Sequence, residues 1–216
     1  MKLLAISTSS RMASVALSVC GRMSCAVDES GSSHSSALMP LVDRLLCENS
    51  LAVRDVDAFA VDVGPGSFTG VRIGVSAANA MAYALAKPVY AVSSLEALRF
   101  AAPDGVCVCA LLDCRNGNGY AALYDGGSEL KPPCAVVISE FLHDVPEKTV
   151  FVGDGAQLHR EAILAAVPGA SVIEGVCVSA HGAVMAVLNG CYRECSGGAV
   201  PMYLRKPQAE RLRSDG

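Results

Sequence analysis

The residues most suited to chemistry belong to a glycine-rich turn and to the helix expected directly after it. They are Gly64, Pro65, Gly66, Ser67, Gly70 and Gly74. A turn of this kind between a strand and a helix leaves backbone N–H groups unpaired beside the positive end of the helix dipole, and phosphates bind at such places. The stretch lacks the lysine and the GKS or GKT ending of a Walker loop, and its spacing is not GxGxxG. A phosphate cradle and a structural turn both stay open, and the local chemistry favours the structural turn.

Ten cysteines and four histidines are the other candidates for metal binding or nucleophilic catalysis. Cys107 and Cys109 would share one face of a strand, and Cys191 and Cys195 form a second pair. No CxxC motif occurs, and the histidines are scattered along the chain. The sequence therefore predicts no metal site and no cofactor. A serine or cysteine hydrolase is disfavoured because no histidine stands in a recognisable nucleophile context.

The composition is that of an apolar, folded protein. Hydrophobic residues make up 52% of the 216 residues and charged residues 18%. This excludes a disordered chain and predicts self-association or a stable partner. The formal net charge of −4 disfavours independent binding of a polyanion such as tRNA. One local basic cluster lies in the tail, where it is typical of a solvated segment: Arg205, Lys206, Arg211 and Arg213.

The N-terminal stretch MKLLAISTSSR is expected to be a strand, because its apolar core ends after Ile6, too early for a secretion signal. No apolar run approaches the roughly 18 residues of a membrane span, since Arg72 and Asn79 interrupt the best candidate. The cysteines are therefore expected to be reduced thiols that fill apolar space, and the expected location is the cytoplasm.

The elements that must position the glycine turn follow a repeated order. Strands are expected at 2–7, 12–20, 23–28, 57–63 and 88–92, with helices from about 34, from about 68 and at 94–101. After residue 105 the order begins again, with strands at 106–112, 119–124, 134–138, 149–153 and 171–174, a flexible DGGSELKPP segment, and helices near 140, at 156–167 and at 180–195. This pattern predicts an α/β duplication with mixed sheets, divided into lobes at 1–102 and 103–216.

The helix that follows the turn is apolar over an unusually wide arc. Small and apolar residues share one face, with a polar stripe opposite at Arg72, Ser76, Asn79 and Tyr83. Val71, Val75 and Ala82 flank one side of the small-residue face, and Ile73 and Ala80 flank the other. Two interpretations stay open, a helix buried within its own domain and a helix that also presents a surface to a partner.

Several blocks, taken in order, resemble one protein family. VGPGSFTGVRIG at 63–74 resembles the signature of the TsaB family, also called YeaZ. LLAISTS, AVSSLEAL, LLDCRNGNGYAALY, FVGDGAQ and PMYLRK resemble further blocks of that family, so that the similarity covers nearly the whole chain.

The resemblance implies an actin-like, sugar-kinase-like (ASKHA) fold of two lobes. It also implies a part in making threonylcarbamoyladenosine (t6A) beside the anticodon of tRNA, as the non-catalytic partner and activator of the catalytic subunit TsaD and alongside the small ATPase TsaE. Contact with tRNA would occur only through the complex.

The residues at the expected catalytic positions fit a non-catalytic member. Ser7 stands where actin-like ATPases usually carry an aspartate, no carboxylate replaces it locally, and a hydroxyl cannot balance a divalent cation. His34 stands where the catalytic relative carries a histidine pair, but Leu38 follows one turn later. The resemblance places a possible vestigial nucleotide site at Asp113, Arg115, Gly153 and Gly155. An equally open interpretation is that Asp113 only orders the turn beside it.

Two functions from different classes follow. In the first, the chain is a scaffold that binds TsaD by packing helix on helix and forms a homodimer through the same surface when alone. The residues expected at this interface are His34, Leu38, Leu41, Leu45, Val71, Arg72, Val75, Asn79 and Ala82. In the second, it is an active ATPase or kinase of the same fold. Ser7 and the missing histidine pair favour the scaffold.

Overall fold

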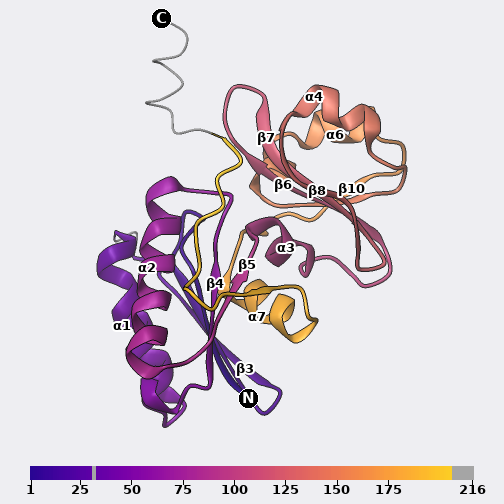
Figure 1. Cartoon of the computed structure of the whole chain (residues 1–216). Helices are drawn as coiled ribbons and strands as arrows, with labels where there is room; N and C mark the ends of the chain where they lie inside the picture. The colour runs from indigo at the N-terminus through magenta and orange to yellow at the C-terminus, as the bar shows by residue number, and fades with distance from the viewer. Residues whose placement is uncertain (31–32, 206–216) are drawn as a thin grey trace, which may run out of the picture.

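The computed structural model describes residues 1–30 and 33–205 (Figure 1). Three basic residues of the expected tail cluster, Lys206, Arg211 and Arg213, lie outside the described residues.

Within this range the first sheet has six strands in the order β11-β5-β4-β1-β2-β3. The strand β1 (Lys2–Ser7) lies at its centre, antiparallel to β2 (Ser14–Val19) and parallel to β4 (Ala58–Asp62). Beyond β2 lies β3 (Arg22–Val27), and beyond β4 lies β5 (Val89–Val92), whose outer edge pairs with β11 (Arg193–Glu194).

The second sheet has five described strands in the order β10-β9-β6-β7-β8. Its central strand β6 (Cys107–Asp113) is antiparallel to β7 (Asn118–Asp125) and parallel to β9 (Val150–Val152). The outer strands are β8 (Ser128–Val137) and β10 (Ser171–Val172). This repeats the order β5-β4-β1-β2-β3 with the same strand directions, so the expected duplicated two-lobe fold is confirmed.

Helices cover the faces of both sheets in layers (Figure 1). The outer face of the first sheet carries α1 (His34–Glu48) and α2 (Phe68–Leu85). Between the two sheets lie α3 (Ser94–Arg99) and α7 (Ala180–Leu188). The far face of the second sheet carries α4 (Ile138–Phe141), α5 (Asp154–Leu158) and α6 (Arg160–Ala166). Two short 3-10 turns, Val53–Asp55 and Leu142–Asp144, complete the described elements.

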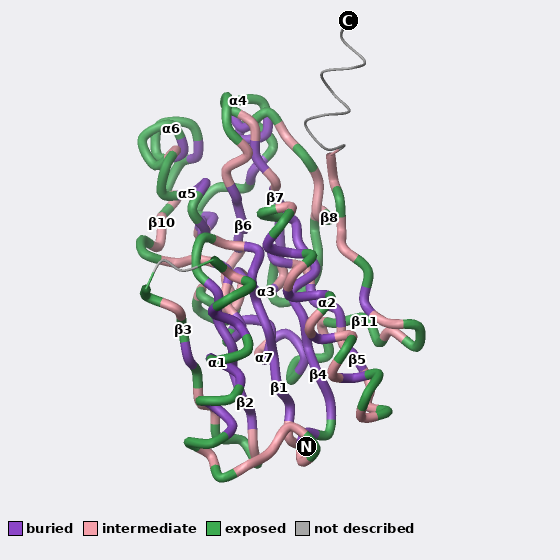
Figure 2. The backbone as a smooth tube through the Cα atoms, turned by 90° about the vertical axis from the view of Figure 1, so that its left-hand side faces the viewer, coloured by how far each residue is buried: buried purple, intermediate pink, exposed green. Residues whose placement is uncertain are grey.

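The apolar character of β1 follows from this layering. Leu4 and Ile6 point toward α1 and α2, whereas Leu3 and Ala5 point toward α3 and α7. A central strand covered on both faces is apolar at every position instead of alternating. Figure 2 shows the tube through β1 and β4 coloured as buried along most of its length.

The C-terminal part of the chain returns to the first lobe, which corrects the expected lobe 103–216. The helix α7 packs on β1, β2 and β4, and β11 extends the first sheet. The expected helix 180–195 is also too long, because α7 ends at Leu188 and a turn through Gly190, with φ +76°, leads into β11.

Two further expectations differ from the structure. The segment DGGSELKPP, expected to be flexible, is mostly part of β8, because residues 128–133 pair with the far end of β7. The expected helix 156–167 is two short helices that meet at His159. No helix among the described residues is both long and apolar enough to span a membrane.

Candidate functional site

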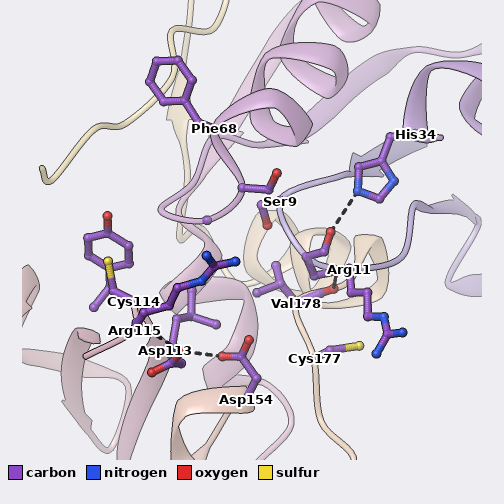
Figure 3. Close-up of a pocket in the computed structure, with 15 residues that line it drawn as sticks. Ser9, Arg11, His34, Phe68, Asp113, Cys114, Arg115, Asp154, Cys177 and Val178 are labelled. Atoms are coloured by element: carbon purple, nitrogen blue, oxygen red, sulfur yellow. Dashed lines mark hydrogen bonds between the residues drawn. The ribbon is translucent and has the colours of Figure 1, made fainter. Parts of the chain in front are cut away.

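A cleft of about 630 Å³ opens between the two lobes (Figure 3). The first lobe contributes Ser9, Ser10, Arg11, His34, Gly66, Ser67 and Phe68. The remaining lining residues are Leu112, Asp113, Cys114, Arg115, Tyr120, Asp154, Cys177 and Val178. Polar groups from two lobes that converge on a concave space are typical of a ligand site.

The glycine turn forms one wall of this cleft. Gly64 has φ +94°, and the Gly64–Pro65 peptide is cis. The Ser67 hydroxyl caps α2 by accepting a hydrogen bond from the Gly70 N–H at 3.2 Å. A methyl group at Gly66 would overlap the backbone of Ser9, and one at Gly70 would overlap the Thr8 carbonyl oxygen. Close approach to the turn after β1 therefore explains these glycines, in agreement with the structural interpretation of the turn.

A buried carboxylate lies beneath this wall. Asp62, at the end of β4, is 0% exposed and accepts hydrogen bonds from the hydroxyls of Ser7, Ser9 and Ser94. The Gly64 N–H donates to the same carboxylate at 3.0 Å. Burial raises the pKa of Asp62, and these hydrogen bonds oppose the rise.

No carboxylate replaces Ser7 locally in the chain, but Asp62 on the adjacent strand accepts its hydrogen bond. Sequence reasoning missed it because a strand-end aspartate carries no motif of its own. It differs from a metal-binding aspartate because both its oxygens accept hydrogen bonds from groups of the protein and the side chain is fully buried. Of the residues bonded to it, Ser9 lines the cleft.

The second lobe supplies the facing wall through the turn between β6 and β7. The Asp113 N–H donates to Asp154 Oδ1 at 3.1 Å, and Asp113 Oδ2 accepts from the Arg115 N–H at 3.1 Å. His159 Nε2 lies 3.5 Å from Asp113 Oδ1. Burial raises the pKa of Asp154. Asp113 thus orders its own turn and also faces the cleft.

Gly153 and Gly155 stand behind this wall and do not line the cleft. A methyl group at Gly153, which has φ +109°, would overlap the Leu111 carbonyl oxygen. One at Gly155 would lie 2.8 Å from the Asp113 nitrogen. The structure therefore places Asp113 and Arg115 at the cleft, with the glycine pair serving the close packing of α5 against β6.

His34 also belongs to the cleft. Its Nε2 atom lies 3.0 Å from the Ser10 carbonyl oxygen, so this nitrogen is the donor (Figure 3). The other ring nitrogen, Nδ1, is buried and has no hydrogen-bond partner among the described residues. His34 was expected at the partner interface and at the start of a helix, and as the first residue of α1 it lines the cleft.

Hydroxyl, guanidinium and carboxylate groups line the cleft. Within residues 1–30 and 33–205, no group of three or more histidine, cysteine, aspartate or glutamate side chains is arranged to hold a metal ion. All ten cysteines are free thiols. Arg11 comes from the first lobe, whereas Arg115 lies on the same turn as Asp113, and Asp154 lines the cleft beside them.

The outer surface of α1 and α2 differs from the expected interface. Most of the expected contact residues are buried in the core between these helices and the first sheet, which makes them unavailable to a partner: Leu38, Leu41, Leu45, Val71, Val75 and Ala82. The flank of α2 that contacts a partner was expected at Val71 and Val75. These two residues pack inward, and Ile73 and Ala80 on the other flank lie toward the outside. Asn79 is half-buried and is bonded to Ala199 through both its amide oxygen and nitrogen.

A groove of about 440 Å³ lies between α1 and α2. It is lined by Ser35, Leu38, Met39, Thr69, Arg72, Ile73, Ser76 and Ala77. Of the expected interface residues, Arg72 is exposed at this groove.

The repeated sheets, the helices between them and the cleft define a two-lobed α/β protein of the actin-like and sugar-kinase-like class. A family model described as "TsaD: tRNA N6-adenosine threonylcarbamoyltransferase" matches residues 28–196. A protein of Escherichia coli named "tRNA threonylcarbamoyladenosine biosynthesis protein TsaB" is 32% identical over 171 residues, which is 73% of each chain. The chain belongs to the TsaB (YeaZ) family.

Other relatives support this assignment. The similarly named protein of Bacillus subtilis is 36% identical over 139 residues, 60% of each chain. That of Haemophilus influenzae is 37% identical over 121 residues, and the match spans 51% of its length. The chain therefore spans between half and two thirds of these two relatives. The solved structure of YeaZ from Pseudomonas aeruginosa superposes with a TM-score of 0.77 at 29% identity, covering 94% of this chain and 99% of that one.

Proposed function

We propose that this chain is a non-catalytic subunit of the machinery that makes t6A in tRNA. In this proposal it binds the catalytic subunit TsaD and activates it for threonylcarbamoyl transfer to the adenosine beside the anticodon. The names of the relatives in E. coli and B. subtilis and the match to the TsaD family model support this role.

The observation that carries the proposal is the outer surface of α1 and α2. Arg72 is the single charged residue of α2, whereas α1 exposes Asp43, Arg44 and Glu48 toward its C-terminal end. The side chains of Tyr83, Met39 and Tyr203 are 92%, 49% and 45% exposed. Aromatic residues, methionine and arginine are enriched at protein interfaces, whereas lysine and glutamate are depleted. Small residues at Ser76 and Ala80 also allow a partner helix to approach closely.

The cleft supports a subunit without chemistry of its own. Ser7 replaces a metal-binding carboxylate, and Asp62 is bonded to three hydroxyl groups beneath the surface. The rival function is an ATPase or kinase that uses Asp113 and Asp154, since both carboxylates face the cleft. We favour the scaffold because a transferring phosphoryl group needs a divalent cation, and these two carboxylates have no third ligand among the described residues.

The remaining parts of the proposal concern the other partners. TsaE joins the assembly of this chain with TsaD, and tRNA is contacted through that assembly, because the chain itself has a formal net charge of −4. Without TsaD, the α1 and α2 surface pairs with a second copy. The chain acts in the cytoplasm, where its cysteines stay reduced.

The test is a tRNA modification assay with purified TsaD, TsaE, tRNA and this chain, omitting each in turn. Size-exclusion chromatography of this chain with and without TsaD accompanies it. We expect a complex with TsaD and loss of t6A when this chain is omitted. Metal-dependent ATP turnover by this chain alone, abolished by Asp113→Ala, would instead support the ATPase.

A further inference from the structure

Arg72 is held in one conformation by two aromatic rings. Its guanidinium carbon lies 3.8 Å from the centroid of the Phe68 ring and 5.7 Å from that of Tyr203. The two rings lie 4.8 Å apart at 31°. Arg72 Nε donates a hydrogen bond of 2.8 Å to the Tyr203 hydroxyl. The side chain is therefore ordered before any partner arrives.

Only part of this guanidinium group is used within the chain. The hydrogen bond from Nε accounts for one of its N–H groups, and the two terminal nitrogens have no hydrogen bond or ion pair with any described residue. The side chain is exposed at the edge of the groove between α1 and α2. A fixed guanidinium with free terminal nitrogens suits an oxyanion that accepts two parallel hydrogen bonds.

Tyr203 depends on a strap formed by residues 199–205. The Met202 N–H donates to the Val63 carbonyl oxygen at 2.7 Å, which attaches the strap to the first lobe. Arg205 Nη2 donates to Asn118 Oδ1 at 2.7 Å, which attaches it to the second lobe. Tyr203 lies between these two attachments, so its hydroxyl is presented to Arg72 by backbone that is itself fixed.

The surroundings of Arg72 favour one of two oxyanions, the carboxylate of a protein side chain over the phosphate of a nucleic acid. Apolar side chains at the neighbouring groove include the exposed Met39 and the half-buried Ile73 and Ala77. No second basic residue occurs on α2, and Arg44 of α1 is paired with Glu48 at 3.9 Å, whereas binding to a nucleic-acid backbone needs several cations along one face. Charge and apolarity together fit a protein helix that carries one acidic side chain.

We propose that Arg72 is the anchor for an aspartate or glutamate side chain on the partner helix that lies in the groove between α1 and α2. This inference rests on the proposed function, which makes TsaD that partner. The carboxylate accepts hydrogen bonds from the two terminal nitrogens of Arg72, and Phe68 and Tyr203 keep those nitrogens in place. The apolar residues of the groove cover the rest of the partner helix.

The test is isothermal titration calorimetry of the full chain with purified TsaD, without tRNA. We expect Arg72→Met to raise the Kd at least about tenfold, because a buried charge pair is lost. Arg72→Lys restores part of the affinity, since an ammonium keeps the charge and loses the paired geometry. Tyr203→Phe keeps the ring and removes the hydroxyl, so we expect a smaller rise in Kd.

The matched control is Arg22→Met, which removes an exposed arginine from β3, away from the groove, and should leave the Kd unchanged. All variants should melt within about 2 °C of the wild type, because the substituted side chains are exposed. The wild-type Kd should also rise more steeply with ionic strength than that of Arg72→Met.

The outcomes separate the inference from the proposed function. If wild-type protein failed to bind TsaD, the proposed function and the inference would both be wrong. If wild-type protein bound and Arg72→Met bound equally well, the inference alone would be overturned. Unchanged binding of Arg72→Met to TsaD, with weaker binding of tRNA to the resulting complex, would identify a phosphate in place of the carboxylate and would also overturn it.

Discussion

Ser7 donates a hydrogen bond of 2.8 Å to Asp62 between the adjacent strands β1 and β4, and both residues are fully buried. The pair lies under the wall of the cleft that Ser9 and the glycine turn form. The Asp62 carboxylate supports that wall by accepting hydrogen bonds from the hydroxyls of Ser7 and Ser9. The same polar network therefore links the stability of the first lobe to the shape of the site.

The first prediction concerns the pH dependence of this network. Burial raises the pKa of Asp62, so the fold favours the neutral carboxyl group. That contribution to stability is fully present below the unfolded pKa of about 4 and is lost as pH rises through the raised folded pKa. Asp62→Asn does not titrate. We therefore expect the melting temperature of the wild type, relative to Asp62→Asn, to fall as pH rises, measured between about pH 4 and pH 8.

Asp57 provides a control, because its contribution to stability depends on pH in the opposite direction. A hydrogen bond from the Lys2 N–H lowers its pKa, so its contribution is present above the unfolded pKa and is lost as pH falls. The wild type should accordingly lose stability relative to Asp57→Asn on acidification. Parallel melting curves for wild type and Asp62→Asn at every pH would contradict the role given to Asp62.

A second prediction tests the packing of α2 on β1. A methyl group at Gly74 would overlap the Thr8 hydroxyl oxygen and would lie 3.4 Å from Ile6 Cγ2. We expect Gly74→Val to lower the free energy of unfolding by about 1 to 3 kcal/mol, as overpacking does. Urea denaturation measures this. Ala80→Val, at an exposed position of the same helix, should cost no more than about 0.5 kcal/mol. Equal losses of unfolding free energy for Gly74→Val and Ala80→Val would contradict a tight contact between Gly74 and Thr8.

A third prediction separates the two sides of α2. Val75 is 4% exposed and lies in the core, so Val75→Arg should lower the free energy of unfolding by more than about 3 kcal/mol, because it buries a charge without a partner. Ser76, the next residue, is exposed at the groove. Ser76→Arg should melt normally and fail to bind TsaD. Thermal melts and pull-downs check both, and a stable Val75→Arg protein would mean that α2 is rotated relative to the sheet.

The fourth prediction concerns the attachment of the strap to α2. Asn79 Nδ2 donates to the Ala199 carbonyl at 2.9 Å, and Asn79 Oδ1 accepts from the Ala199 N–H at 2.8 Å. Asn79→Ala leaves both backbone groups unpaired and should cost about 1 to 3 kcal/mol. Asn79→Asp keeps the acceptor and should cost less. Limited proteolysis should cut the strap faster in Asn79→Ala than in the wild type. An unchanged cleavage rate would mean that the Asn79–Ala199 hydrogen bonds do not hold the strap in place.

The duplicated fold could be predicted because it rests on local patterns. Apolar strands, amphipathic helices and the turn at Gly64 each carry their own signal, and their order repeats. Gly74 was expected on the helix after the glycine turn, and it lies there against the side chains of Thr8 and Ile6. The resemblance to the TsaB family pointed to Asp113 and Arg115, which the structure brings to one cleft.

The orientation of α2 could not be predicted from its sequence. Val71 and Val75 on one flank are as apolar as Ile73 on the other, and a helical wheel does not say which flank meets the sheet. Asp62 was missed for a related reason, because its partners Ser7 and Ser94 lie 55 and 32 residues away along the chain. A strand as short as β11 pairs through its backbone and has no side-chain pattern to detect.

The return of the chain to the first sheet affects how the protein can be made. Until residues 193–205 have left the ribosome, the edge of β5 lacks its partner strand, and the face that α7 covers is open to water. An unpaired edge beside an apolar face is where nascent chains aggregate. The apolar face of the first sheet therefore stays uncovered until α7 has been made, and the cleft is complete only once Cys177 and Val178 are in place.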